Sequence, residues 1–209
     1  MRTSPHTVSD LMTHTAIAVG SRASYKEIVQ LLDQWKVSAL PVLAGEGRVI
    51  GVVSEADLLH KEEGRPDGEP GRGNQPVDAA KADAVSAEDL MSTPAITVHA
   101  NAPLGEAARI MARRQVKRLP VVDSSGLLEG VISRGDLLKV FLRSDEDIGA
   151  EATDVLSGLP DTAGLEARVA DGVVTLGGVL PDRAMVPLVA RAVRAIEGVV
   201  DIRLDLRQP

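Results

Sequence analysis

The chain has 209 residues, of which 44% are hydrophobic, and a formal net charge of −7. It contains no cysteine, so a disulfide framework and a cysteine-ligated metal site are excluded. The negative charge disfavours a general attraction to nucleic acid. No apolar run approaches the roughly 20 residues of a membrane-spanning helix, and no apolar signal core opens the sequence, so we expect a cytoplasmic protein.

Four short motifs occur twice, always 79 residues apart. Asp-Leu-Met begins at residues 10 and 89, Leu-Pro-Val at 40 and 119, Gly-hydrophobic-hydrophobic-Ser at 51 and 130, and Asp-Leu-Leu at 57 and 136. A repeat with a constant shift indicates two copies of one folded unit. We expect a first copy at residues 8–61, a second copy at 87–143, and between them a flexible linker at 62–86 that is rich in glycine, proline and charge.

In the first copy, an amphipathic helix is predicted to begin after Ser24. Ser24 and Glu27 have the spacing of a capping box, in which their side chains satisfy free amides at the helix start. The residues predicted to face the core are Ile28, Leu31, Leu32 and Trp35. In the second copy Pro103 replaces Ser24, which suits a helix start. The corresponding apolar residues are Ala107, Ile110 and Met111.

After each helix, the sequence predicts a strand, a glycine-containing turn, a second strand and a helix. The predicted strands are residues 40–43 and 49–53 in the first copy, and 119–122 and 127–132 in the second. The last helix of each copy is expected to start near Asp57 or Asp136. Each copy is therefore a small α/β unit.

Residues 145–207 show a different pattern and predict a third domain of α-β-β-α-β order. The expected elements are a helix at 147–156, strands at 165–169 and 173–176, a helix at 181–196 and a strand at 200–206. Asp171-Gly172 is a strong signal for a tight turn between the first two strands. The whole chain is thus predicted to be α+β, with two tandem α/β repeats followed by this smaller domain.

The Asp-Leu-Met opening, the Leu-Pro-Val strand and the Gly-hydrophobic-hydrophobic-Ser-x-x-Asp motif resemble those of the CBS domain, named after cystathionine beta-synthase. The resemblance implies a pseudo-two-fold pair that binds an adenine nucleotide (AMP, ADP or ATP) or a related adenosyl ligand between its copies. It also implies that the ligand is regulatory, alone or with magnesium, that no resident cofactor is needed, and that two pairs form a homodimer.

Two ligand sites are implied by this resemblance, each joining the motif of one copy to apolar walls of the other. The first is expected to contain Ile17, Val37, Ser38, Lys117, Arg118, Ser133 and Asp136. The second is expected to contain Ala39, Ser54, Asp57, Ile96 and Val116. In each motif the serine and the helix start offer donors to a phosphate, and the carboxylate suits a ribose diol. Local helix capping by the same serine and aspartate is the alternative.

The two sites are not equal in charge. Lys117-Arg118 aligns with Ser38-Ala39 at the same shift of 79, so the sequence assigns a cationic pair to the first site alone. Such a pair suits phosphate oxygens. We expect the first site to bind a phosphorylated adenine nucleotide and the second to be empty or to take an uncharged adenosine-like ligand. The alternative is a solvated basic helix end that includes Arg113 and Arg114.

The last domain is similar to the BON domain. Residues 171–179 read Asp-Gly-Val-Val-Thr-Leu-Gly-Gly-Val, close to the family pattern Asp-Gly-x-Val-x-Leu-x-Gly-x-Val with the final valine one place early. The resemblance covers residues 145–207 and implies contact with a phospholipid surface or a protein partner. Residues 144–209 carry 12 acidic and 6 basic residues and no aromatic residue, which favours a protein partner over an anionic membrane.

The sequence offers little for catalysis. Its histidines, His6, His14, His60 and His99, have no carboxylate or nucleophile at a useful spacing, and there is no phosphate loop of the Gly-Lys-Ser type. We expect a non-catalytic sensor with no metal site, whose tail contacts an unknown protein or a membrane. The alternatives are an interaction scaffold with vestigial clefts, a membrane-surface BON protein, and a nucleotide hydrolase that uses Asp136 with a metal.

Overall fold

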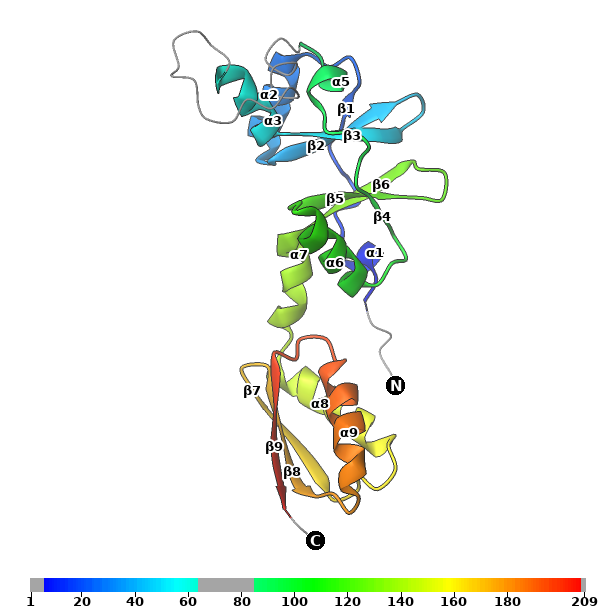
Figure 1. The fold of residues 1–209 in the computed structure, drawn as a ribbon, viewed down its shortest axis with the longest axis vertical. Coiled ribbons are helices and arrows are strands. Elements are labelled where there is room, and N and C mark those ends of the chain that lie inside the picture. The colour runs from blue at the N-terminus through cyan, green and yellow to red at the C-terminus, as the bar shows by residue number, and fades with distance from the viewer. Residues whose placement is uncertain (1–5, 64–84, 208–209) are drawn as a thin grey trace. The chain divides into compact units, whose positions relative to one another are not determined.

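The computed structural model describes residues 6–63 and 85–207, without the side chains of 60–63. Most of the predicted linker, residues 64–84, lies outside the described residues. The chain divides into two compact units, residues 7–134 and a second unit of residues 135–209 with residues 1–6. Figure 1 labels the elements of both units.

The two copies of the repeat have the same element order. The first contains α1 (Val8–Leu11), β1 (Val19–Gly20), α2 (Tyr25–Trp35), β2 (Ala39–Ala44), β3 (Arg48–Ser54) and α3 (Glu55–Glu63). The second contains α5 (Ala87–Leu90), β4 (Val98–His99), α6 (Leu104–Arg114), β5 (Arg118–Val122), β6 (Leu128–Ser133), α7 (Arg134–Leu138) and the 3-10 helix η1 (Lys139–Leu142). The predicted strand-turn-strand-helix order is confirmed in both.

Each copy builds a three-stranded sheet, β1-β2-β3 or β4-β5-β6. The two longer strands are antiparallel, and a two-residue strand that the sequence did not predict adds parallel to the middle one. This short strand pairs only with Val42 and Leu43 of β2, so it does not reach Pro41. A middle strand can therefore hold a proline, which has no N–H to donate, without losing a hydrogen bond.

Helix α2 begins as predicted, but the last residue of its predicted apolar stripe does not face the core. Ser24 Oγ accepts a hydrogen bond from the Glu27 N–H at 3.3 Å, and Ile28 and Leu32 are buried. Trp35, predicted to face the core, is 51% exposed. Because α2 ends at Trp35 and Lys36 turns the chain in the left-handed region (φ 51°), this side chain lies beyond the buried part of the stripe.

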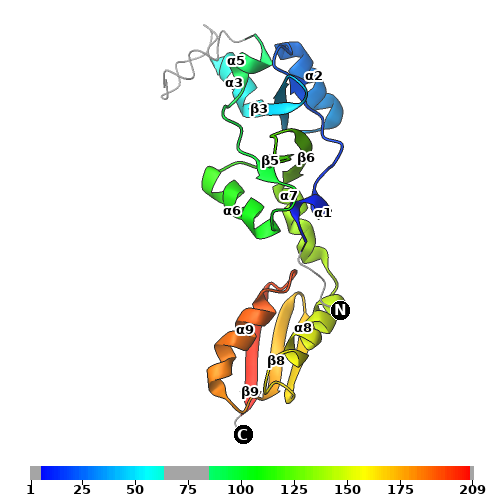
Figure 2. The same cartoon turned by 90° about the vertical axis from the view of Figure 1, so that its right-hand side faces the viewer.

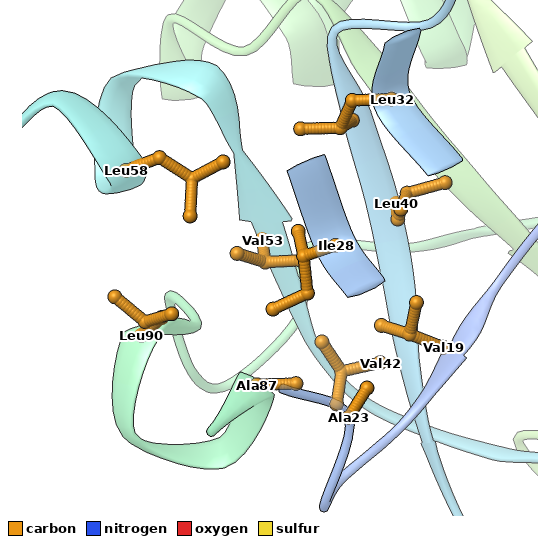
Figure 3. Close-up of a cluster of buried hydrophobic side chains, with 10 residues drawn as sticks. All are labelled: Val19, Ala23, Ile28, Leu32, Leu40, Val42, Val53, Leu58, Ala87 and Leu90. Atoms are coloured by element: carbon orange, nitrogen blue, oxygen red, sulfur yellow. The ribbon is translucent and has the colours of Figure 1, made fainter. Parts of the chain in front are cut away.

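The first helix of each copy packs against the other copy. The Ala87 N–H of α5 donates to Ala23 O at 2.8 Å, and the Val8 N–H of α1 donates to Ala102 O at 2.9 Å. Ala87 and Leu90 are fully buried in the core of the first copy, as Figure 3 shows. The sequence repeat is therefore not the packing unit, because the core of one copy contains a helix of the other.

This exchange explains two of the repeated motifs. The methionine of each Asp-Leu-Met motif packs over the glycine that begins the Gly-hydrophobic-hydrophobic-Ser motif of the other copy. A Cβ added to Gly51 would lie 2.8 Å from Met91 Cγ, and one added to Gly130 would lie 2.7 Å from Thr13 O and 2.9 Å from Met12 Sδ. Glycine is required because a side chain would displace the incoming segment.

The second unit contains the α-β-β-α-β domain. Its elements are α8 (Asp145–Ser157), β7 (Leu165–Ala170), β8 (Val173–Val179), the 3-10 helix η2 (Arg183–Met185), α9 (Val186–Arg194) and β9 (Asp201–Arg207). The sheet order is β7-β8-β9, with β8 antiparallel to β7 and parallel to β9. Helices α8 and α9 pack on one face (Figures 1 and 2), where they cover Val174 and Leu176 of β8. The predicted fold class is confirmed.

Two local predictions in this domain have different outcomes. Asp171 and Gly172 both have positive φ (52° and 72°), as the predicted tight hairpin turn requires. The helix predicted at 181–196 is shorter, because Asp182 Oδ1 accepts from the Ala184 N–H at 2.8 Å in a 3-10 turn before α9. Pro187 then stands in the first turn of α9, where a proline is tolerated.

Candidate functional site

Residues 7–134 enclose a cavity of about 290 Å³ that both copies line. The first copy contributes the end of β3 and the start of α3. The second contributes the segment before β4 and the turn between α6 and β5. Every residue of the second predicted site lines this cavity: Ala39, Ser54, Asp57, Ile96 and Val116. The structure therefore brings this set together at one place.

The Asp57 carboxylate is a buried polar group of the cavity that residues of both copies hold by hydrogen bonds. Asp57 is 8% exposed, and its Oδ2 accepts hydrogen bonds from Ser54 N at 2.9 Å and Ser54 Oγ at 2.6 Å. Its Oδ1 accepts from Ser92 Oγ of the second copy at 3.3 Å. Asp57 thus bonds locally to the residue before α3, which is part of the capping considered as the alternative, and the same bonds fix the orientation of the carboxylate in the cavity wall.

The basic pair lies at this cavity too. Arg118 Nη2 donates to Ser38 Oγ at 3.1 Å and Nη1 donates to Ala39 O at 3.4 Å, so its guanidinium bridges the second copy to the first. Lys117 is exposed, and no described residue forms a hydrogen bond or ion pair with its ammonium. The sequence assigned this pair to the first site alone, whereas the structure places it among the residues that line the second. The physical reason is that β5 begins at Arg118 next to the start of β2.

The first predicted set is spread over several places. Ile17 and Val37 are half-buried against the core of the first copy. Val37, Ser38 and Arg118 line a separate, more open groove of about 670 Å³ on the α2–α3 side. Ser133 ends β6 within the first unit.

Asp136 of the same set lies in the first turn of α7 and belongs to the second unit. It forms an ion pair with Lys139 Nζ at 2.7 Å. The role of this set as a ligand site stays a prediction.

Several lining residues were missed by the sequence, and two of them bear on the chemistry of the cavity. Ser92 holds Asp57, and Glu55 begins α3 at the edge of the cavity. Ser92 directly follows the second Asp-Leu-Met motif, but its position becomes clear only from the crossing of that segment to β3, where Ser92 and Val52 exchange backbone hydrogen bonds of 2.9 and 3.1 Å. Glu55 aligns with Arg134 at the shift of 79, and this charge difference was a readable signal.

Histidines contribute nothing to the described cavity wall. His6, His14 and His99 do not line it, and the side chain of His60 lies outside the described residues. In the part of the chain that the structure describes, no group of three or more histidine, aspartate or glutamate side chains is arranged to hold a metal ion. Among the same residues, no helix is both long and apolar enough to cross a membrane.

Comparison with known proteins agrees with the repeat and with the domain that follows it. The model of the CBS domain matches residues 8–64 and 87–143. The chain belongs to the CBS domain family. The model of the BON domain matches residues 144–208, so a BON domain follows the CBS pair.

Two relatives illustrate the similarity. The CBS domain-containing protein YhcV of Bacillus subtilis is 29% identical over 150 residues, which span 71% of this chain and 94% of YhcV. The chloroplastic protein CBSX2 of Arabidopsis thaliana is 30% identical over 154 residues, which span 66% of this chain and 64% of CBSX2. The crystal structure of CBSX2 in complex with AMP superposes with a TM-score of 0.57 at 30% identity, covering 66% of this chain and 97% of that one.

Proposed function

We propose that the CBS pair binds an adenine nucleotide or a related adenosyl ligand in the 290 Å³ cavity and that the protein is a non-catalytic, cytoplasmic sensor. The observation that carries this proposal is the convergence of the five residues of the second predicted site on one cavity that both copies line. CBSX2, a relative of the same family, was solved with AMP. The volume lies at the lower end of the roughly 300–1,000 Å³ typical of small-molecule sites, which favours one mononucleotide over a dinucleotide.

The chemistry of the wall suggests how such a ligand lies. Ile96, Val116 and Ala39 offer apolar contact to a base, and the Asp57 carboxylate can accept hydrogen bonds from two ribose hydroxyls. The phosphate belongs beside Lys117, whose ammonium has no partner among the described residues, because Arg118 is already bonded to the first copy. We therefore propose that this cavity takes a phosphorylated ligand.

Calorimetry on the full chain tests the ligand, using AMP, ATP, adenosine and S-adenosylmethionine. Asp57→Asn is expected to weaken AMP binding at least about tenfold, because it removes a charged acceptor, whereas Asp136→Asn, its match in the other copy, binds like the unmodified chain. Lys117 is exposed, so Lys117→Ala should not disturb folding. It should weaken the binding of AMP but not that of adenosine. Loss of AMP binding in Asp136→Asn alone overturns the assignment to this cavity. No binding of any of the four compounds favours the scaffold alternative.

The absence of catalysis has its own test. Steady release of inorganic phosphate from ATP by the full chain with magnesium, removed by Asp136→Asn, would support the hydrolase alternative instead. We expect no release above that of a heat-denatured sample.

Regulation requires that the ligand prefers one of two states of the protein. We propose that ligand binding alters the geometry of the CBS pair or of its homodimer, and that the BON domain or a protein partner detects the change. Val29 and Leu59 on the α2–α3 side are 40% and 61% exposed beside the open groove, and we propose this face as the homodimer contact. Leu59→Asp should lower the mass measured by light scattering. Small-angle scattering that shows no change at saturating AMP counts against the switch.

A further inference from the structure

The last strand of the BON domain is an edge strand with an unusual charge pattern. β9 pairs with β8, and within the described residues no strand lies on its other side. Most of its residues are exposed, including Leu204 at 47%. An edge of seven residues presents unpaired backbone N–H and C=O groups, which are a template for another strand.

The side chains of β9 alternate strictly between the two faces of the sheet. Val174 and Leu176, which are buried under the helices, are in register with Ile202 and Leu204 of β9. Leu206 lies on the same face as Ile202 and Leu204. The residues between them lie on the other face, because successive side chains of a strand point to opposite faces. The charged residues therefore all lie on the face away from the helices: Asp201, Arg203, Asp205 and Arg207.

This sequence of charges is complementary to itself when reversed. In an antiparallel pair of two β9 strands centred on Leu204, Asp201 lies opposite Arg207 and Arg203 lies opposite Asp205. The two-fold symmetry repeats both pairs, so four opposite-charge pairs form. Leu204 lies opposite Leu204 of the second copy. An antiparallel pair centred on Arg203 or on Asp205 instead places like charges opposite each other. A parallel in-register pair does the same. Registers centred on Ile202 or Leu206 also oppose aspartate and arginine, but they form only two such pairs each, so charge favours the register centred on Leu204.

We infer that β9 is a docking edge for a second copy of this chain, and that an antiparallel pair of two β9 strands joins the two BON sheets into one six-stranded sheet. Charges on an edge strand usually discourage pairing, but charges that meet opposite charges directly across a strand pair stabilise it. Here they meet opposite ones. Asp201 has only a long, exposed ion pair of 3.7 Å with Arg194, and the charges of Arg203, Asp205 and Arg207 have no ion-pair partner among the described residues.

Single-cysteine cross-linking of the full chain tests this edge, because the natural sequence has no cysteine. Residues on the two-fold axis of an antiparallel pair have Cα atoms about 4.5–5.5 Å apart, within the roughly 4.4–6.8 Å of a disulfide. Leu204→Cys should therefore form a covalent dimer under mild oxidation. Glu166→Cys is the matched control, since Glu166 is 74% exposed on the opposite edge strand β7, and it should cross-link poorly.

Charge reversal in the Leu204→Cys background then tests the register. Arg203→Asp places aspartate opposite Asp205 twice and should lower the yield of covalent dimer at least about tenfold. Adding Asp205→Arg restores four opposite-charge pairs and should restore the yield.

Poor cross-linking of Leu204→Cys, equal cross-linking of Glu166→Cys, or no recovery in the double reversal would each overturn the inference. The result does not depend on ligand binding or on the α2–α3 contact of the CBS pair, so this edge and the proposed function fail or succeed separately.

Discussion

The two copies of the CBS repeat share their backbone contacts and differ in the charge beside them. In the first copy the Glu55 N–H that begins α3 donates to Ser38 O at 3.1 Å, and in the second the Arg134 N–H that begins α7 donates to Lys117 O at 3.0 Å. The same bond thus joins an acidic residue to a neutral neighbour in one copy and two basic residues in the other. The two copies are therefore alike in backbone geometry at this position and differ in the charge at the helix start.

The two copies are also similar in their cores. Substitutions there should give the largest change in stability and test this similarity. Leu40 and Leu119 occupy the same position of β2 and β5, and both are fully buried. Replacing either by alanine should cost about 2–5 kcal/mol of unfolding free energy. Because α5 packs in the core of the first copy, both variants should shift one common unfolding transition of residues 7–134, measured by chemical denaturation.

Leu142→Ala is the control for this pair of variants. Leu142 is 82% exposed in η1, and its truncation should change stability by less than about 0.5 kcal/mol. Two separate transitions, one shifted by each leucine variant, would show that the copies unfold independently.

Substitution of the glycine in the repeated motif should change stability by a smaller amount, and by a different amount in each copy. An added Cβ meets the backbone oxygen of Thr13 at Gly130 but the flexible side chain of Met91 at Gly51. Gly130→Ala should therefore cost about 1–3 kcal/mol, and Gly51→Ala less, because a side chain moves more easily than the backbone. Gly105 in α6 has open space around its Cβ position, and Gly105→Ala should stabilise by up to about 1 kcal/mol. Equal losses at positions 51 and 130 would contradict this difference.

The third comparison concerns the charge of the residue that begins α3 or α7. This prediction rests on the proposed ligand. Glu55→Arg gives the first copy the residue that the second copy holds at Arg134. It replaces repulsion of a phosphate by attraction and should tighten AMP binding about tenfold, or roughly 1.4 kcal/mol, while adenosine binding stays the same. Glu55→Gln should lie between the two. Calorimetry that shows the same gain for adenosine would show that the effect is not on phosphate.

Local features of the fold were predictable because they depend on neighbouring residues. The Ser24 cap, the four longer strands of the repeats and the Asp171-Gly172 turn all follow from side-chain chemistry or backbone freedom within a few positions. Trp35 was mispredicted because periodicity does not tell where a helix leaves the core. The two-residue strands were missed because they are too short to show a pattern.

The candidate site was predictable only in part. The repeat and the family resemblance named Ala39, Ser54, Asp57, Ile96 and Val116, which line one cavity. They did not show that the basic pair lies beside this set, since that depends on how β5 of one copy approaches β2 of the other. For the same reason Ser92 was missed, because its contact with Asp57 joins residues 35 positions apart through the exchanged segment.

The smallest expected effect concerns the start of α5, the helix that crosses between copies. Hydrogen bonds from the Ser86 hydroxyl and backbone N–H hold the pKa of Asp89 below its ordinary value of 3.8. A lowered pKa in the folded state means that the carboxylate contributes stability fully above pH 3.8, and that this contribution disappears as the pH falls through the lower, folded-state pKa. Chemical denaturation of Asp89→Asn and the unmodified chain should therefore differ most near neutral pH and converge in acid.

Glu88→Gln on the same helix is the matched control for Asp89→Asn, since Glu88 stands next to Asp89 but does not receive the Ser86 bonds. Its stability difference from the unmodified chain should not follow the same acid-dependent course. Asp10 accepts the equivalent bonds from Thr7 N and Thr7 Oγ1 at 2.6 and 2.9 Å in the first copy. If Asp89→Asn lowers stability and Asp10→Asn does not, the two exchanged helices, alike in their hydrogen bonds, differ in how much each copy depends on them.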